Sequence, residues 1–244
     1  MKILFTGDWH LDRMTAGYDR FEDIRDAIEQ TVNVAMDSNI DMYVFLGDLA
    51  NPNNVRSHRA AATAMGVAET LRRAAIDSIW IVGNHDVIED GNVDFSGGAY
   101  STLSTLQSAG FTVISNPGGY SDLVNGIQFL AFPFPASHKV YDPISTIEEE
   151  VRSGALDSNN EKLLAIGHLS LPSAKMGSES ADMARGRAIE WPVAAIKEYW
   201  PNAIIVGGHY HHQQTCNGVM FPGSLARLGF DEETNEPGYL ILEV

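Results

Sequence analysis

Short apolar runs alternate with longer amphipathic stretches along most of this chain. The main runs span four to six positions and are rich in β-branched and aromatic residues, which is typical of buried strands. The longest amphipathic stretches, at residues 19–37 and 55–75, repeat apolar side chains at helical spacing, so each predicts a helix that covers a sheet. Strands that alternate with helices form βαβ units, and the pattern therefore predicts an α/β fold.

The same pattern places the remaining elements. Turn residues occupy positions 116–119, and two polar stretches, 89–98 and 169–187, are expected to be loops, of which the second could act as a lid. Strands are expected at residues 2–6, 41–46, 79–82, 111–115, 127–132, 162–166, 203–206, 213–216, 219–221 and 239–244, and further helices at residues 100–109, 144–151 and 191–199.

Five of the predicted strands end in Gly or a polar residue, followed by a side chain that can bind a metal ion. In extended backbone, residues two positions apart point the same way, so Asp8 and His10 can hold one ion together. Because ligands bind at the carboxyl ends of strands in open α/β sheets, we expect all of these side chains to gather at one edge. They are Asp8 and His10, Asp48, Asn84 and His85, His168, and His209 and His211.

This gathering of side chains predicts a metal site. Carboxylates and imidazoles brought this close would repel one another or lose hydration unless a cation held them. Oxygen and nitrogen ligands without a thiolate suit manganese, iron, zinc or nickel better than calcium or magnesium alone. Without His85, the seven candidate ligands are still too many for one ion and divide naturally into two sets that share a carboxylate. Two ions so placed form a clamp for phosphoryl transfer, so the sequence predicts a two-metal phosphoesterase, although a single histidine of this kind is more often structural.

Composition narrows the class of protein. With 244 residues, 44% of them hydrophobic, the chain can bury a large core and is expected to form a single domain over residues 1–244. We find no signal-peptide pattern and no apolar stretch of membrane-spanning length, so a soluble, cytoplasmic protein is expected. The single cysteine, Cys216, excludes an internal disulfide, fits a reducing compartment and is expected to be a small buried hydrophobe.

The net charge of −16 limits the choice of partners. Acidic proteins repel nucleic acid at long range, whereas proteins that bind duplex unaided usually carry a basic face. If this protein acts on DNA, bound cations or a partner must assist it. Much of the charge can equally be solvated surface that keeps the protein soluble.

Successive motifs resemble those of the calcineurin-like metallophosphoesterases, and the resemblance covers nearly the whole chain. It implies a four-layer α-β-β-α sandwich, in which two mixed sheets are flanked by helices and the site lies at the edge where strand ends meet. The matching motifs are Gly7-Asp8-Trp9-His10, Gly47-Asp48, Gly83-Asn84-His85-Asp86, Gly167-His168 and Gly208-His209-Tyr210-His211.

The resemblance also implies roles for the site residues. Two ligand sets would share Asp48 as the bridging carboxylate. His85 would sit beside the scissile phosphate and protonate the leaving oxygen or stabilise its charge, which suits an imidazole because its ordinary pKa lies near neutrality. Asp86 would either orient His85 or have a structural role in the loop. The two sets are Asp8, His10 and His211, and Asn84, His168 and His209.

Two parts of the chain are similar to the SbcD type of DNA repair exonuclease. One is Asp8-Trp9-His10-Leu11, and the other is the terminal stretch 221–239, through its segments 221–227 (FPGSLAR), 229–233 (GFDEE) and 237–239 (PGY). This similarity implies phosphodiester cleavage in DNA, manganese as the metal and a coiled-coil ATPase of the SbcC type as a possible partner. Three features depart from the family pattern, and one of them is the net charge of −16, which disfavours unaided binding of duplex. Asn51 stands where an acidic residue or His is common, and the chain is expected to lack the DNA-binding cap and ATPase-docking region because it ends at Val244.

The sequence therefore predicts a DNA phosphodiesterase, an exonuclease or endonuclease of repair or recombination type, in which a metal-bridging hydroxide attacks phosphorus in line. One alternative is a phosphodiesterase or phosphatase acting on nucleotides or other small phosphoesters, which the acidity and the missing cap favour. A non-catalytic binding module of the same fold is a second alternative, disfavoured because all seven ligands and His85 are present. Arg13 could reach a phosphate, or it could be an ordinary surface arginine.

Overall fold

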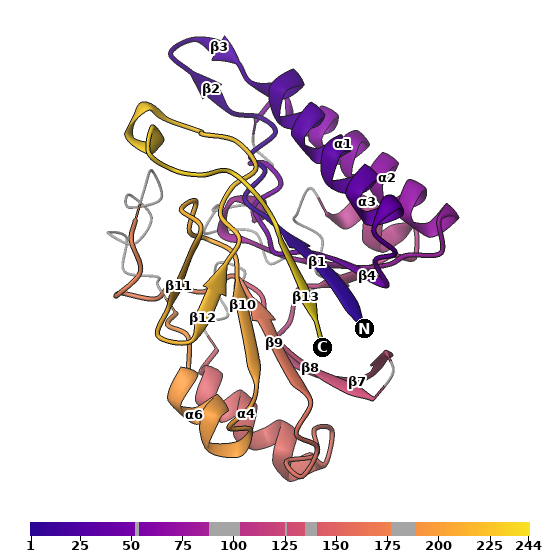
Figure 1. Cartoon of the computed structure of the whole chain (residues 1–244), viewed down its shortest axis with the longest axis vertical. Helices are drawn as coiled ribbons and strands as arrows, with labels where there is room; N and C mark the ends of the chain where they lie inside the picture. Colours follow the sequence, from indigo (N-terminus) through magenta and orange to yellow (C-terminus); the bar gives the residue numbers. More distant parts are fainter. Residues whose placement is uncertain (52–53, 88–102, 125, 135–140, 177–188) are drawn as a thin grey trace, which may run out of the picture.

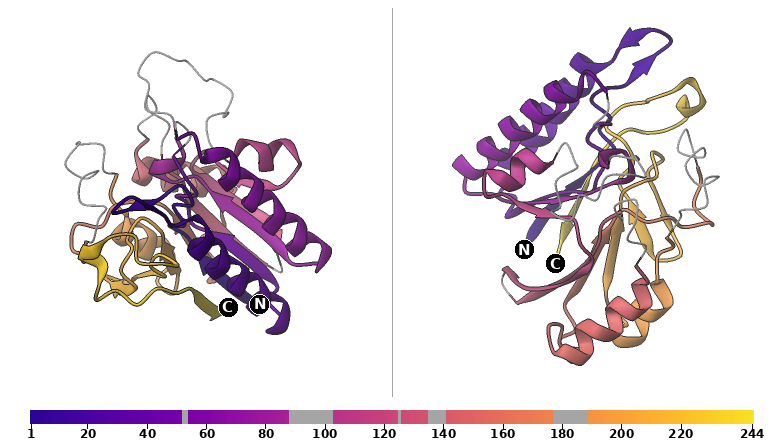
Figure 2. Two further views of the ribbon diagram at one scale, coloured as in Figure 1. Left: turned by 90° about the horizontal axis from the view of Figure 1, so that it is seen from above. Right: turned by 180° about the vertical axis from the view of Figure 1, so that it is seen from behind.

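Two mixed β-sheets pack face to face, and helices cover both outer faces (Figures 1 and 2). The computed structural model describes residues 1–51, 54–87, 103–124, 126–134, 141–176 and 189–244. The arrangement confirms the four-layer α-β-β-α sandwich that the sequence predicts. The expected loop at 89–98 and most of the expected lid lie outside the described residues.

The first sheet has the strand order β13-β1-β4-β5-β6. Four of its strands are parallel, and β13 is antiparallel to β1 at one edge. Parallel neighbours need crossover connections, and long helices between β1, β4 and β5 supply them. The strands are β1 (Lys2–Thr6), β4 (Met42–Phe45), β5 (Asp77–Ile81), β6 (Thr112–Ile114) and β13 (Leu240–Glu243).

The second sheet has the strand order β11-β12-β10-β9-β8-β7. Its four inner strands are parallel, whereas the edge strands β7 and β11 are antiparallel to their neighbours. The strands are β7 (Gly118–Val124), β8 (Ile127–Phe132), β9 (Leu163–Gly167), β10 (Ile204–Gly207), β11 (Gln214–Cys216) and β12 (Val219–Phe221).

Three helices, α1 (Phe21–Asp37), α2 (Ser57–Arg73) and α3 (Ser104–Ser108), cover the first sheet, and α4 (Pro143–Ser153) and α6 (Val193–Tyr199) cover the second (Figure 1). Local sequence fixes the ends of α4. The Asp142 carboxylate accepts hydrogen bonds from the first backbone N–H groups, and Gly154 ends the helix with φ 76°. No helix in the described ranges is both long enough and apolar enough to cross a membrane.

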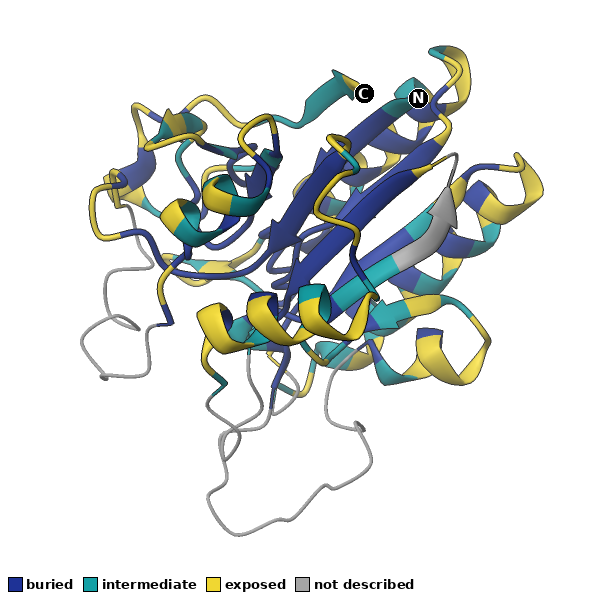
Figure 3. Ribbon diagram, turned by 90° about the horizontal axis from the view of Figure 1, so that it is seen from below, coloured by how far each residue is buried: buried dark blue, intermediate teal, exposed yellow. Residues whose placement is uncertain are grey.

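The core has three apolar layers, one under each group of helices and one between the sheets. The central layer contains side chains from both sheets, including Phe5, Ile81, Phe129 and Ile166, all fully buried. Figure 3 shows this continuous buried band along the strands, with exposed positions on the outer sides of the helices. The two sheets are therefore held in register by apolar contact, and their strand ends occupy fixed relative positions.

Three local expectations were wrong. Residues 118–119 begin strand β7 instead of completing a turn, because antiparallel pairing with β8 extends the chain there. A short hairpin, β2 (Met14–Thr15) with β3 (Tyr18–Asp19), precedes α1 and is absent from the prediction. Cys216 is only partly buried, and its Sγ lies 3.3 Å from the carbonyl oxygen and from the hydroxyl of Ser173.

The layer between the sheets predicts an unequal response to two phenylalanine truncations. Phe129→Ala should lower the free energy of unfolding by about 3–5 kcal/mol, because it removes a fully buried ring and leaves a cavity. Phe230→Ala, at a side chain that is 78% exposed, should change it by less than about 0.5 kcal/mol. Chemical denaturation of both variants checks this, and equal losses would contradict a stabilising role for the layer between the sheets.

Candidate metal centre

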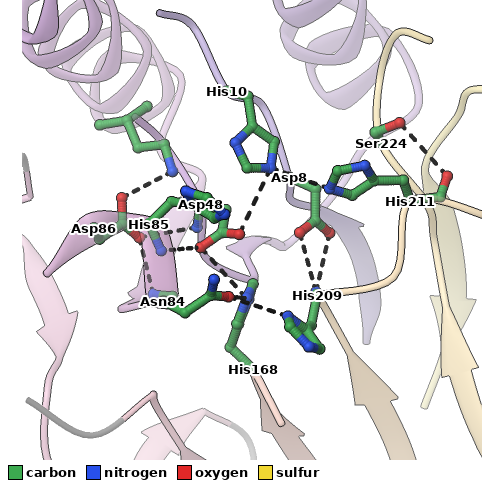
Figure 4. A network of polar contacts seen from close by, with 12 residues as sticks. Asp8, His10, Asp48, Asn84, His85, Asp86, His168, His209, His211 and Ser224 are labelled. Carbon is green, nitrogen blue, oxygen red and sulfur yellow. Dashed lines mark hydrogen bonds and ion pairs between the residues drawn. The ribbon is translucent and has the colours of Figure 1, made fainter. Parts of the chain in front are cut away.

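Strand ends from both sheets meet at one edge of the sandwich and bring the predicted site residues together (Figure 4). The loops after β1 and β4 stay paired beyond the strands, since Asp8 N donates to Gly47 O at 2.9 Å and His10 N donates to Asp48 O at 3.0 Å. In the second sheet, Gly208 N donates to Gly167 O at 2.9 Å in the same way. These backbone hydrogen bonds beyond the strand ends hold the polar residues that follow each strand at one edge of the sandwich.

Glycines allow this close approach of the loops. A Cβ at Gly47 would lie 2.5 Å from Nδ1 of His168, and the φ of Gly47 is 105°, a conformation that other residues rarely adopt. A Cβ at Gly83 would overlap the Asp48 carboxylate. Space therefore requires glycine at both positions, and at Gly47 the backbone conformation requires it as well.

Four of the seven predicted ligands have left-handed backbone conformations. Their φ values are 50° at Asp8, 44° at His10, 62° at Asp48 and 86° at His209. Such conformations cost on the order of 1–3 kcal/mol each in non-glycine residues, and they persist where the surrounding structure enforces them. Asp and His tolerate this region better than most residues do. Strain collected in one place is typical of functional sites.

The first predicted ligand set comes together around the end of β1. Nε2 of His10 lies 3.1 Å from Nε2 of His211, so the two imidazoles point their ring nitrogens at a common position. Potential ligand atoms of Asp8, His10 and His211 all lie within 4.8 Å of one another. The Asp8 carboxylate also accepts hydrogen bonds from the backbone N–H of His209, at 3.0 and 3.2 Å.

The second set also converges. Oδ1 of Asn84 lies 2.7 Å from Nε2 of His168 and 3.1 Å from Nδ1 of His209. His168 belongs to the second sheet, yet its Nδ1 lies 2.8 Å from the carbonyl oxygen of Leu46 at the end of β4. A carbonyl acceptor at Nδ1 leaves Nε2, which faces Asn84, as the ring nitrogen that could bind a cation.

Asp48 lies between the two sets. Its Oδ1 is 3.3 Å from Nε2 of His168, and its Oδ2 is 3.6 Å from Nε2 of His10. Potential ligand atoms of Asp48 fall within 4.8 Å of those of Asp8 and His168 on one side, and of His10 and His85 on the other. These overlapping groups suit two adjacent cations that share a carboxylate.

Burial and mutual charge shift the ionisation of these groups. Burial raises the pKa of Asp8 to about 7. Burial also opposes ionisation of Asp48, but the nearby His168 and His85 outweigh it and hold the pKa of Asp48 well below its ordinary value. Burial and the neighbouring His85 lower the pKa of His10, whereas Asp48 overcomes burial and raises the pKa of His168 to about 9. Ionised carboxylates buried in this way are stable only with positive charge beside them, which protons on the imidazoles or a divalent cation can supply.

His85 and Asp86 occupy a short 3₁₀ turn at Asn84–Asp86. The backbone N–H of His85 donates to Oδ1 of Asp48 at 2.8 Å, and the His85 ring lies 4.8 Å from that of His10, centre to centre. The Asp86 carboxylate accepts from the backbone N–H groups of Asp48, Leu49 and Gly83 at 2.8 to 2.9 Å. Burial, together with the charge of Asp48, raises the pKa of Asp86 to about 6. These three bonds favour the structural role for Asp86.

Three further polar residues have partners outside the two predicted ligand sets. Nε of Arg13 donates to the carbonyl oxygen of Leu228 at 2.9 Å, so this side chain links the stretch after His10 to the terminal stretch 221–239. The backbone N–H of Asn51 donates to the Asp12 carboxylate at 3.3 Å. The exposed His58 is bonded locally, since its Nδ1 lies 2.9 Å from the carbonyl oxygen of Val55.

One buried side chain beside the site was not singled out from the sequence. Glu232 is 0% exposed, and its Oε1 lies 2.7 Å from Nδ1 of His211. It belongs to the terminal stretch 221–239, which carries the similarity to SbcD-type proteins, but nothing in the local sequence gives it a partner 21 positions away.

Known proteins share this architecture and these motifs. The sequence profile of the calcineurin-like phosphoesterases matches residues 1–213. The chain belongs to the calcineurin-like phosphoesterase family, and membership implies a metal-dependent phosphoester hydrolase. The convergent carboxylates and imidazoles suit the dinuclear metal site that this implies.

A curated relative supports the predicted relation to the SbcD type. The SbcD subunit of the nuclease SbcCD from Staphylococcus epidermidis is 26% identical to this chain over 263 residues. The alignment covers 100% of this chain but 66% of the relative, so the chain spans just under two thirds of that protein's length.

Solved structures show the same fold at low sequence identity. A dimetal phosphatase from Danio rerio aligns with a TM-score of 0.55 and 14% identity, over 92% of this chain and 87% of its own. The purple acid phosphatase PPD1 from yellow lupin seeds aligns with a TM-score of 0.54 and 17% identity, over 91% of this chain and 43% of its own. The likeness extends to the fold alone.

The charge balance of the site predicts that divalent cations stabilise the protein. Addition of Mn²⁺ to chelator-treated protein should raise the melting temperature by several degrees, because a bound cation compensates the buried carboxylates. Asp48→Asn should abolish most of this rise, whereas Asp37→Asn, at an exposed carboxylate on α1, should retain it. Differential scanning fluorimetry of the three proteins checks this. A full rise in Asp48→Asn would remove Asp48 from the site.

Proposed function

We propose that this protein is a two-metal phosphodiesterase that cleaves DNA, of the repair or recombination type, with residues 1–244 acting as one catalytic domain. The observation that carries the proposal is the convergence of six oxygen and nitrogen donors, in two sets of three, around the buried carboxylate of Asp48. In this proposal Asp8, His10 and His211 hold one cation. Asn84, His168 and His209 hold the other. Manganese is the expected metal, with iron, zinc or nickel as alternatives.

When bound, the two divalent cations supply Lewis acidity that activates a water and neutralises charge on the phosphoryl oxygens. The protein's own contribution is to position the ligand side chains. Asp86 fixes the loops that carry Asp48 and Asn84 through its bonds to backbone N–H groups, and the apolar layer behind them keeps both sheets in place. The ligand side chains are therefore held in place before any substrate arrives.

His85 is the proposed general acid. Its backbone is fixed by the bond to Asp48, and its ring stands beside His10, at the boundary of the predicted ligand sets. The imidazolium would give its proton to the leaving oxygen as the phosphodiester bond breaks, and it would recover a proton from solvent afterwards. His85 is only partly buried, which leaves a path for that exchange.

The relation to the SbcD protein of the nuclease SbcCD supports DNA as the substrate and a coiled-coil ATPase of the SbcC type as a partner. A partner with a basic surface would help because the net charge of −16 repels the DNA backbone. We propose action in the cytoplasm, where a lone cysteine stays reduced. The second candidate is hydrolysis of nucleotides or other small phosphoesters, and the same acidity favours it, since small substrates need no extended basic face.

Hydrolysis of end-labelled DNA tests this proposal. With Mn²⁺, the protein should shorten or cut single- or double-stranded DNA, and chelation should stop the reaction. His85→Ala should lower the rate by about 10²–10⁴-fold, the usual contribution of a general acid, while Mn²⁺ binding persists. His58→Ala, at an exposed histidine bonded to its own loop, should retain wild-type activity.

A small phosphodiester run in parallel separates the two candidate functions. Cleavage of the ester with intact DNA would keep the metal chemistry and overturn DNA as the substrate. Full activity of His85→Ala on both substrates would overturn the role of His85. No hydrolysis of either substrate, by protein shown to bind Mn²⁺, would favour the binding module.

A further inference from the structure

One histidine in each predicted ligand set, His168 and His211, is supported by a different kind of oxygen. Nδ1 of His168, in the second set, lies against the backbone carbonyl of Leu46, which carries no net charge. Nδ1 of His211, in the first set, lies 2.7 Å from a carboxylate oxygen of Glu232. A carboxylate behind an imidazole makes it a more basic ligand than a carbonyl does, and it fixes the ring more firmly.

Solvent cannot hydrate the carboxylate of Glu232, so its partners must come from the protein. Its side chain is 0% exposed, and burying a carboxylate is costly unless hydrogen-bond donors surround it. Oε1 faces His211, and Oε2 accepts a hydrogen bond from the backbone N–H of Leu228 at 2.7 Å. An ionised carboxylate can only accept, so with Glu232 charged His211 carries its proton on Nδ1, and the lone pair of Nε2 is left to act as a ligand on the side that faces His10.

The segment that carries Glu232 is itself fixed to the other side of the site. The carbonyl oxygen of Leu228 accepts hydrogen bonds from Arg13 Nε and from Thr15 Oγ1, both at 2.9 Å. Arg13 and Thr15 lie three and five residues past His10 in the sequence. Glu232 therefore reaches His211 from a segment that is bonded to the stretch following His10, another ligand of the same set.

We infer that Glu232 is a positioning residue for the cation held by Asp8, His10 and His211: it fixes the ring and tautomer of His211 and makes that position bind its cation more tightly. The inference rests on the proposed metal set. It adds an asymmetry between the two positions, because a carboxylate supports His211 whereas a neutral carbonyl supports His168. Glu232 itself touches neither substrate nor the reacting atoms.

Binding of Mn²⁺ alone tests the inference without any substrate. Isothermal titration of chelator-treated wild type should show two Mn²⁺ equivalents. Glu232→Gln should weaken one of them by about 10–100-fold and leave the other within about threefold of wild type. Glu233→Gln removes the same charge from the next, exposed residue and should bind as wild type does. Circular dichroism of each variant without metal verifies that it is folded.

The outcomes separate the inference from the proposed function. Wild-type binding of both equivalents by Glu232→Gln would overturn the inference while the metal centre stands. Equal weakening of both equivalents would overturn its assignment to one position. Wild type that binds no Mn²⁺ would overturn the metal centre itself.

A second measurement on wild-type protein covers the case in which Glu232→Gln does not fold. With Zn²⁺ bound and ¹⁵N-labelled histidine, the His211 ring should show a proton on Nδ1 that exchanges slowly with water, and metal on Nε2. A His211 ring with its proton on Nε2, or with metal on Nδ1, would contradict the inference, whatever the variants do.

Discussion

Both halves of the site depend on how Asp48 is held. Its carboxylate is buried between histidines of the two predicted ligand sets and accepts the backbone N–H of His85. Its own backbone N–H is held by Asp86, a second buried carboxylate that also bonds Leu49 and Gly83. Two adjacent buried acids repel each other, so this arrangement persists only because N–H groups and imidazoles surround them.

The rest of the fold holds these buried carboxylates and imidazoles together. The apolar layer between the sheets positions strand ends from both sheets, while glycines remove the side chains that would keep the loops apart. Left-handed backbone at four predicted ligands adds strain where contact is closest. The stability gained in the three apolar layers offsets the cost of this strain and of burying the polar groups.

Much of this could be predicted from the sequence, for physical reasons that also explain the failures. Apolar runs that end in glycine and then a polar residue mark strand ends well, so the convergence of Asp8, Asp48 and His168 was foreseeable; their assignment as ligands stays a prediction. Residues 118–119 looked like a turn because glycine pairs carry no strand signal. Glu232 escaped notice because its partner is distant in sequence, and only the folded chain brings the two together.

Strand β13 has a consequence for how the protein is made. It pairs with β1 from Lys2↔Glu243 to Phe5↔Leu240, across almost the whole length of the sequence. During synthesis β1 can pair with β4 early, but its other edge has no partner until residues 240–243 have left the ribosome. An open edge of this kind can accept a strand from another nascent chain, so pairing with residues 240–243 protects β1 from misassembly.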